Sequence, residues 1–290
     1  MEKICKETQI LNPISKRCVK KDGVIGRKIL IANEKINIFW ERNSCYIDSA
    51  LLSIFHNRDK FIEDDLLKAP LNHYNNELSK IGDNIRKELI KIYDIISNRK
   101  KDKTNNCSLL RKLLNDYYKK FIKIYPNKYI INRNEDWRKS QLDTFDIFDL
   151  FNIIFDIKYD NFLYNIPFDL LIEKKKIFIK NIFKKSFLKT NKLLLKIFRN
   201  SGTTKINVKI IPSKTIKLPK NSFDLHLTSI IIHYGNIGGG HYICLYKSNN
   251  KWFEYDDLIS FPTYIGSLSN IIKNDKYISN IVGLVYSKYI

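Results

Sequence analysis

The chain is organised around the sequence NSCYIDSALLSIF at residues 43–55. Its apolar side chains recur at i, i+3, i+4, i+7 and i+8, the spacing of one helix face. These residues are Ile47, Ala50, Leu51, Ile54 and Phe55. The spacing predicts a buried helix with Cys45 in its first turn.

Cys45 has two possible roles. Asn43 and Ser44 are good N-cap residues, so we expect the helix to begin there. The thiol would then lie at the positive end of the helix dipole, which favours the nucleophilic thiolate. Alternatively, Cys45 is a core residue, because free cysteines are often buried and most buried ones are inert.

The length and composition indicate a globular protein. With 290 residues, of which 44% are hydrophobic, the chain can bury a full core, and one large domain with a small appendage is the simplest arrangement. No run of eighteen uncharged apolar residues occurs, and the N-terminus lacks the apolar segment of a secretion signal. We therefore expect a soluble, intracellular protein without a membrane partner.

The net charge of +21 is compatible with nucleic-acid binding, because lysine and arginine bind phosphates. The lysines, however, are scattered along the whole chain. Their densest runs, at residues 98–103 and 173–176, are typical of solvated loops or helix faces. Since clustering is a better indicator than net charge, we do not expect nucleic acid to be a partner.

The cysteines indicate neither a zinc site nor a disulfide framework. They lie at positions 5, 18, 45, 107 and 244, and no two form a Cys-x-x-Cys pair. An odd count without a signal peptide argues against a disulfide scaffold, and at least one thiol is free. We expect no metal and no other cofactor.

Residues 1–31 form a short segment with Asn-Pro and Asp-Gly turn signals and little core of its own. Its order of Cys5, Asn-Pro-x-Ser-x-Arg, Cys18 and two glycines resembles the two-cysteine adaptor domain of large DNA viruses. Such domains are often joined to ubiquitin-system peptidases or kinases. The resemblance implies an adaptor whose partner the sequence does not identify; the alternative is a flexible arm.

The remaining residues, 32–290, change character near residue 160. Helical apolar spacing comes first, and β-branched, alternating segments follow. The predicted helices cover 77–97, 108–125 and 140–155, and the predicted strands include 205–211 and 224–234. We expect an α+β fold in which a helical lobe and a β-sheet lobe face one cleft, where sites tend to form.

A second group of reactive side chains lies at residues 238–257, GGGHYICLYKSNNKWFEYDD. Two apolar runs flank the asparagines at 249 and 250, which predicts a hairpin with a two-residue turn. His241 and Asp256 then become diagonal neighbours on one face, about 7 Å apart at the backbone. Asp257 is expected on the other face.

This pairing favours the catalytic role of Cys45. An acid that binds one nitrogen of His241 leaves the other nitrogen to act on a thiol. The glycines before His241 allow the backbone to bend and a substrate chain to pass closely. The remaining histidines are expected to be structural: His56, His73, His226 and His233.

Three segments, in this order, resemble ubiquitin-specific proteases, above all the cylindromatosis-type branch and its viral relatives. Residues 43–49 are similar to the Cys box, residues 141–148 (QLDTFDIF) to the Gln-Gln-Asp helix, and residues 227–257 to the His box. The resemblance covers residues 37–290. It implies that residues 32–290 form a papain-like cysteine peptidase domain.

The resemblance also implies a role for each matching residue. Cys45 would be the nucleophile, His241 the general base and Asp256 the acid that orients it. Asp257 and Asn43 would support the site. The positions that would bind substrate are Gln141, Gly239, Gly240 and Tyr242.

Two departures from the family pattern are evident. Trp40 stands where many members have an oxyanion-hole asparagine, so other donors are needed, such as the Cys45 backbone N–H or the Asn43 side chain. The zinc-bearing fingers of the family are also missing, because the cysteine pairs are absent.

The resemblance therefore implies a viral deubiquitinase that acts on ubiquitin conjugates, hydrolysing the bond after the C-terminal Gly-Gly of ubiquitin, in the host cytoplasm or the virion. One alternative is a protease for another ubiquitin-like modifier or for virion proteins. The other is an inactive ubiquitin-binding module that has kept the fold.

Overall fold

A computed structural model describes most of the chain. Trp40, His73, Gly238 and Gln141 lie outside the described part. The described residues are 5–34, 38, 41, 43–57, 61–72, 75–97, 105–127, 143–157, 163–185, 189–201, 204–236, 239–259 and 261–288.

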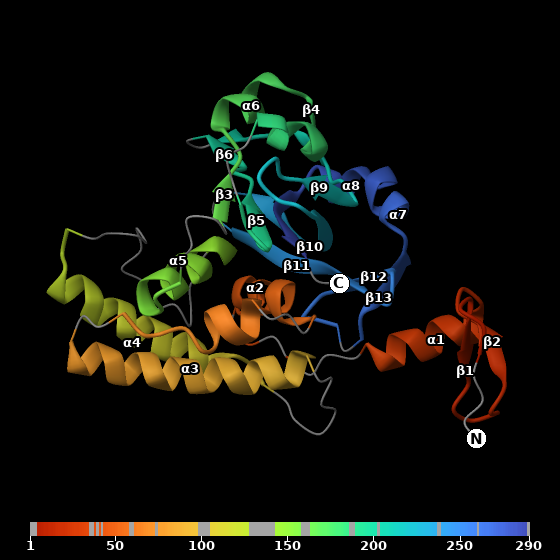
Figure 1. Cartoon of the computed structure of the whole chain (residues 1–290), viewed down its shortest axis with the longest axis horizontal. Helices are drawn as coiled ribbons and strands as arrows, with labels where there is room; N and C mark the ends of the chain where they lie inside the picture. The colour runs from red at the N-terminus through yellow and green to blue at the C-terminus, as the bar shows by residue number, and fades with distance from the viewer. Residues whose placement is uncertain are drawn as a thin grey trace.

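The N-terminal residues form a small unit, drawn in red at one end of the molecule in Figure 1. Strands β1 (Gln9–Leu11) and β2 (Cys18–Lys20) pair antiparallel, and helix α1 (Val24–Asn33) follows. A disulfide joins Cys5 to Cys18. The expectation of no disulfide scaffold is therefore wrong for this unit, because a segment too short for a core gains stability from a cross-link.

Two long helices form the base of the helical lobe. They are α3 (Asn76–Ser97) and α4 (Ser108–Ile124), which pack side by side and match the predicted helices at 77–97 and 108–125. Each buries one apolar stripe and leaves its charged face in solvent. A π-helical segment (Phe61–Leu66) precedes α3.

Helix α5 (Thr144–Ile154) confirms the third predicted helix but begins at a defined cap. The Asp143 carboxylate accepts from the Phe145 backbone N–H at 3.0 Å, and the Asp146 carboxylate accepts from the Asp143 backbone N–H at 3.0 Å. This capping box starts the helix at Thr144. Residues 140–142, which the prediction included, lie outside the described part.

Helix α2 (Cys45–Phe55) joins the two lobes. All its residues are buried, because it contacts α3 and α5 on one side and strands β10 and β11 on the other (Figure 1). The predicted apolar stripe therefore understates its burial. The polar residues Asp48, Ser49 and Ser53 are enclosed as well.

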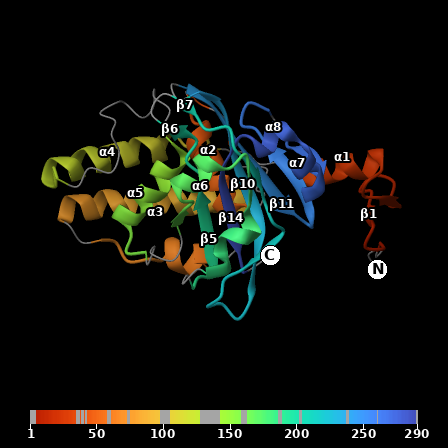
Figure 2. The same cartoon turned by 90° about the horizontal axis from the view of Figure 1, so that it is seen from above.

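The second lobe is an eight-stranded sheet with the order β13-β12-β11-β10-β14-β5-β3, and β9 pairs with β10 at the side of this path. Figure 2 shows its central strands lying across the helices below them. The strands are β3 (Leu163–Asn165), β5 (Lys192–Lys196), β9 (Thr215–Lys217), β10 (Asp224–Asn236), β11 (Gly239–Ser248), β12 (Lys251–Tyr255), β13 (Thr263–Gly266) and β14 (Ile281–Ser287).

Side chains alternate across this sheet and build a core on each face. On β10, Ile231 packs in the core that contains α2, whereas Ile230 and Ile232 pack in the opposite core. The other elements of this lobe are α6 (Phe168–Glu173), β4 (Lys176–Phe178), a 3₁₀ helix (Ile179–Lys185), β6 (Asn200–Ser201), β7 (Thr204–Lys205), β8 (Lys209–Ile211), α7 (Leu268–Lys273) and α8 (Asp275–Ile278).

The predicted strand at 205–211 is only partly correct, because β7 ends at Lys205 and β8 begins at Lys209. The buried Arg199 side chain explains the interruption. Its guanidinium donates to the backbone carbonyls of Ile206 and Val208, so a side chain binds groups that a neighbouring strand would bind. The predicted strand at 224–234 is confirmed by β10.

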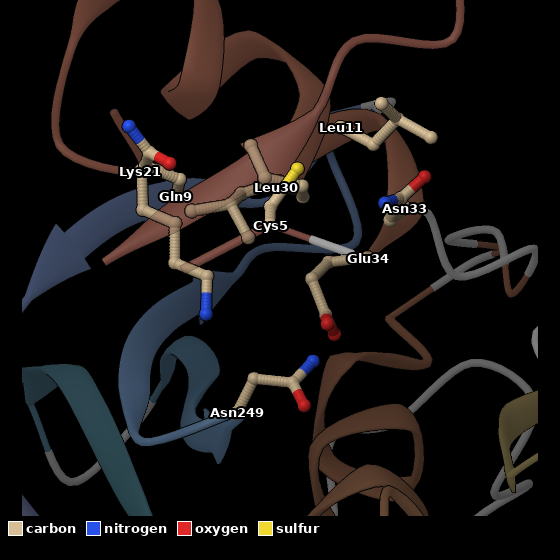
Figure 3. A pocket seen from close by; sticks show the side chains of 9 residues that line it. Cys5, Gln9, Leu11, Lys21, Leu30, Asn33, Glu34 and Asn249 are labelled. Carbon is tan, nitrogen blue, oxygen red and sulfur yellow. The ribbon is translucent and has the colours of Figure 1, made fainter. Parts of the chain in front are cut away.

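The N-terminal unit touches the sheet lobe near the β11–β12 turn. Asp22 accepts hydrogen bonds from Lys251 at 2.8 Å and from the Tyr264 hydroxyl at 2.7 Å. A hollow of about 380 Å³ lies beside these contacts, with Leu30 and Glu34 on one side and Asn249 on the other (Figure 3).

The described residues thus form a mixed helix and sheet structure, as the sequence predicts. None of the helices in this part of the chain is both long enough and apolar enough to cross a membrane.

Candidate active site

The turn before α2 is held by hydrogen bonds that the sequence does not predict. Ser44 has helical backbone angles and its side chain does not cap the helix. Instead its hydroxyl donates to Asp48 Oδ2 at 2.6 Å and accepts from the Glu41 backbone N–H at 2.9 Å. Asn43 has φ 63°, a left-handed value that asparagine tolerates. The expected side-chain cap of Ser44 is wrong, but Cys45 begins the helix as predicted.

Arg111 on α4 supports the same turn from the helical lobe. Its Nη1 donates to the Glu41 carbonyl at 2.7 Å, and its Nε donates to the Tyr46 hydroxyl at 3.3 Å. Arg111 is 2% exposed. Cys45 therefore lies between two residues, Glu41 and Tyr46, that Arg111 holds in place, which restricts the position of its thiol.

The β11–β12 hairpin has the predicted register. Asn249 and Asn250 form the turn with φ 48° and 62°, the positive values of a type I′ turn. Ser248 pairs with Lys251, and Cys244 pairs with Tyr255. This register brings the start of β11 next to the residues that follow β12.

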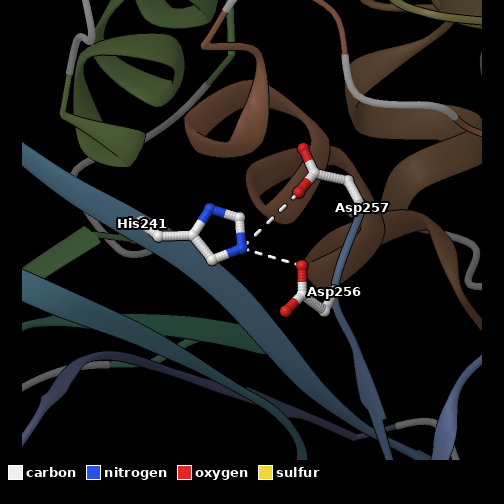
Figure 4. Close-up of side chains that lie close together, drawn as sticks. All are labelled: His241, Asp256 and Asp257. Atoms are coloured by element: carbon white, nitrogen blue, oxygen red, sulfur yellow. Dashed lines mark hydrogen bonds and ion pairs between the residues drawn. The ribbon is translucent and has the colours of Figure 1, made fainter. Parts of the chain in front are cut away.

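His241 and Asp256 meet there, as predicted. His241 Nε2 donates to Asp256 Oδ1 at 2.8 Å (Figure 4). The same carboxylate oxygen accepts from the Leu258 backbone N–H at 3.0 Å, which fixes the acid in place. Because Nε2 is bound, the acid determines the orientation of the imidazole ring.

The expected orientation of Asp257 is wrong. Its Oδ1 lies 3.7 Å from the same Nε2 of His241, and Figure 4 shows both carboxylates on one side of the ring. Strand β12 ends at Tyr255, so the alternation of side chains that predicted opposite faces no longer applies at residues 256 and 257.

Electrostatic interactions join these residues to the thiol of Cys45. Burial acts to lower the pKa of His241, but hydrogen bonds to Asp256 and to the Cys45 side chain raise it to about 10. Burial acts to raise the pKa of Asp256, and its hydrogen bond from His241 brings the pKa below the ordinary value. His241 is therefore protonated at neutral pH, and a cationic imidazole beside a thiol stabilises the thiolate.

The structure brings Cys45, His241, Asp256 and Asp257 together, with Asn43 two residues before the thiol. The two described glycines of the glycine run differ in their surroundings. An added Cβ at Gly239 would meet nothing within 4 Å, whereas one at Gly240 would collide with the Tyr234 carbonyl. Gly239 is therefore the open position beside the site, and Gly240 permits the close approach of β10 and β11.

Tyr242 is mostly enclosed. The residue is 6% exposed, and its ring stacks on His233 with a centroid separation of 4.3 Å. His56 is also buried, and its Nδ1 lies 3.0 Å from the Leu52 carbonyl. The substrate-binding roles of Tyr242 and Gln141 stay predictions, since Gln141 lies outside the described residues.

Asp48 is a site residue that the sequence analysis does not identify. It is fully buried on the first turn of α2 and forms hydrogen bonds with Ser44, Asp257 and Cys107. The sequence contains one signal for this role: Asp48 lies within the predicted buried helix, and an ionisable residue is rarely buried without a partner.

The group formed by His241, Asp256 and Asp257 is the one set among the described residues with donor atoms spaced for a metal ion, all within 4.8 Å. His241 Nε2 already forms a hydrogen bond with Asp256 Oδ1 at 2.8 Å, a contact in which the nitrogen carries a proton that lies between the two atoms. This geometry suits proton transfer.

Comparison with known proteins identifies the family of the chain. Residues 40–260 match the family described as ubiquitin carboxyl-terminal hydrolase. Over 62 residues, 20% of this chain, the sequence is 37% identical to "Ubiquitin carboxyl-terminal hydrolase A" of Dictyostelium discoideum. The matched segment spans 7% of that protein's length. Because the match spans most of its length and includes Cys45, His241 and Asp256, the chain belongs to the ubiquitin carboxyl-terminal hydrolase family.

Proposed function

We propose that this protein removes ubiquitin from conjugates by hydrolysing the bond after the C-terminal Gly-Gly of ubiquitin. The observation that carries the proposal is the placement of His241, which is bound to Asp256 and contacts the thiol at the start of α2. Family membership supports ubiquitin as the substrate. The open backbone at Gly239 suits a substrate chain that ends in small residues.

The first half of the reaction uses the protonated His241. The Cys45 thiolate attacks the carbonyl carbon of the terminal glycine, and the oxyanion forms near the start of α2. The Cys45 backbone N–H and the Asn43 side chain are the proposed donors to this oxyanion. His241 then gives its proton to the departing lysine amine, which leaves a thioester on Cys45.

The second half of the reaction restores the site. The now neutral His241 takes a proton from water as the water attacks the thioester carbonyl. The carbon–sulfur bond breaks, the Cys45 thiolate leaves, and ubiquitin is released with a free carboxylate. Asp256 holds the ring in one orientation throughout and stabilises its cationic form.

We further propose that the enzyme is viral and that residues 1–31 form an adaptor. The cysteine pattern of this segment supports the adaptor role, and the partner is undefined. Of the two proposed locations, the virion suits the Cys5–Cys18 disulfide better than the host cytoplasm, because cytosolic reductants keep thiols reduced.

The test is to incubate the protein with ubiquitin that carries a C-terminal electrophile and to measure the intact mass. One adduct is expected, and Cys45→Ala should abolish it. The other free cysteines are poor nucleophiles, since burial raises the pKa of Cys107 and of Cys244. An adduct that persists in Cys45→Ala would contradict the assignment.

The same experiment separates the alternatives. Probes built on other ubiquitin-like modifiers should react far more slowly than the ubiquitin probe if ubiquitin is the substrate. A fluorogenic ubiquitin substrate distinguishes an enzyme from a binding module, because an inactive module would bind ubiquitin without releasing the fluorophore.

A further inference from the structure

Two buried carboxyl groups lie in contact beneath the catalytic residues. Asp48 belongs to the first turn of α2 and is 0% exposed, and the Asp257 side chain is 1% exposed. Asp48 Oδ2 accepts from the Ser44 hydroxyl. Among the described residues, no donor reaches Asp48 Oδ1 or either oxygen of Asp257, although the two side chains are in hydrogen-bonding contact with each other.

This arrangement requires a proton between the two acids. An ionised carboxylate only accepts hydrogen bonds, so two carboxylates in contact would repel and leave buried oxygens without a donor. One proton converts the contact into an O–H···O⁻ hydrogen bond, which is short and strong. Burial, and then the charge of the other acid, raise the pKa of Asp257 well above its ordinary value. Burial also raises the pKa of Asp48.

The charged and titratable groups around the pair favour a single negative charge on it. His241 is the cation that faces Asp257, and its attraction favours keeping one acid ionised. The Ser44 and Cys107 side chains form hydrogen bonds with Asp48 that favour its ionised form. The charges of Cys45 beside Asp48 and of Asp256 beside Asp257 favour keeping the second acid neutral. Tyr255 is a buried phenol near both acids.

We propose that Asp48 and Asp257 share one proton, and that this bridge positions the nucleophile helix against the catalytic histidine. Asp48 holds Ser44, the residue before Cys45, while Asp257 lies 3.7 Å from His241. The bridge therefore joins the start of α2 to the segment after β12, the two elements that bring the thiol and the acid to the imidazole. Both acids are positioning residues in this role.

The shared proton makes a prediction that does not depend on activity. The unfolded chain releases this proton above pH about 4, the ordinary range for Asp, whereas the folded chain keeps it. Between about pH 5 and the raised pKa of the pair, the unfolding equilibrium constant should therefore gain about one factor of ten per pH unit from this proton. The folded state loses stability as the pH rises through that window.

The test compares urea unfolding, followed by circular dichroism, across this pH range in the full chain. Asp48→Asn and Asp257→Asn each replace the shared proton with an amide N–H that does not titrate. Each variant should lose about one unit from the slope of log Kunf against pH. Asp83→Asn, which removes an exposed carboxyl group on α3, should keep the wild-type slope.

A kinetic measurement tests the positioning role, which rests on the proposed function. The measurement is the pH profile of kcat/KM for a fluorogenic ubiquitin substrate. Its alkaline limb should move to higher pH in Asp48→Asn, because the amide N–H that replaces the shared proton is not lost at high pH and the bridge to Asp257 remains. Wild-type slopes in both Asn variants would overturn the shared proton. Altered slopes with an unmoved alkaline limb would overturn the positioning role alone, and altered slopes in a chain without turnover would overturn only the proposed function.

Discussion

Replacing Asp256 with alanine should slow catalysis strongly but less than the loss of the acid in an isolated triad. Two carboxylates approach the same nitrogen of His241, at 2.8 Å from Asp256 and 3.7 Å from Asp257. The substitution removes the hydrogen bond to the first and leaves the second nearby. It also removes the acceptor of the Leu258 backbone N–H, so the segment after β12 loses one anchor.

The magnitude follows from the interaction that is lost. A hydrogen bond to a charged group contributes about 1.5–3 kcal/mol, and each 1.36 kcal/mol is a factor of ten. Asp256→Ala should therefore lower kcat about 10- to 150-fold. When the acid of a triad is lost without a substitute, the loss is about 10⁴-fold. The double variant Asp256→Ala/Asp257→Ala should approach that larger value.

The assay is steady-state cleavage of a fluorogenic ubiquitin substrate by each single variant and by the double variant. Circular dichroism and thermal unfolding confirm that each variant is folded. A control, Asp169→Ala, removes an exposed acid on α6 and should leave kcat unchanged. If Asp256→Ala left kcat unchanged in a well-folded protein, Asp256 would not be the principal partner of His241.

Three further predictions concern stability and the N-terminal unit. The pKa of His241 is raised from 6.5 to about 10, so its stabilising contribution is complete below pH 6.5 and is lost as the pH rises toward 10. The difference in unfolding free energy between wild type and His241→Gln should shrink across that window in urea titrations. Gly240→Ala should lower the unfolding free energy by about 1–3 kcal/mol, because its methyl group collides with the Tyr234 carbonyl, whereas Gly239→Ala should change it by less than about 0.5 kcal/mol. Deleting residues 1–31 should leave cleavage of a small ubiquitin substrate largely intact, and a loss of about a hundredfold with the fold preserved would show that this unit helps to build the site.

Local patterns in the sequence were sufficient to predict the elements that carry the proposed catalytic residues. The apolar spacing after Cys45 predicts α2, and the paired asparagines predict the β11–β12 turn and its register. These predictions succeed because helix period and turn chemistry depend on neighbouring residues alone. The meeting of His241 with Asp256 follows from the same register.

Features that depend on particular side-chain contacts were not predictable in this way. The Cys5–Cys18 disulfide is a property of one small unit, so the cysteine count of the whole chain was misleading. The interruption between β7 and β8 depends on a guanidinium that binds carbonyl groups several residues away. Neither signal is present in local periodicity.

The orientation of Asp257 shows that the alternation of side chains predicts orientation only within a paired strand, and β12 ends next to the candidate active site. Alternation of side chains holds only while backbone pairing continues, and pairing with β11 stops at Tyr255. Beyond that residue the backbone is free to turn both acids toward His241. Asp257 then reaches Asp48 on α2, a contact that no pattern within either segment encodes. The residues that connect the two lobes are therefore those whose positions depend on tertiary structure, and they include Asp48 and Asp257, the acids that support the proposed catalytic geometry.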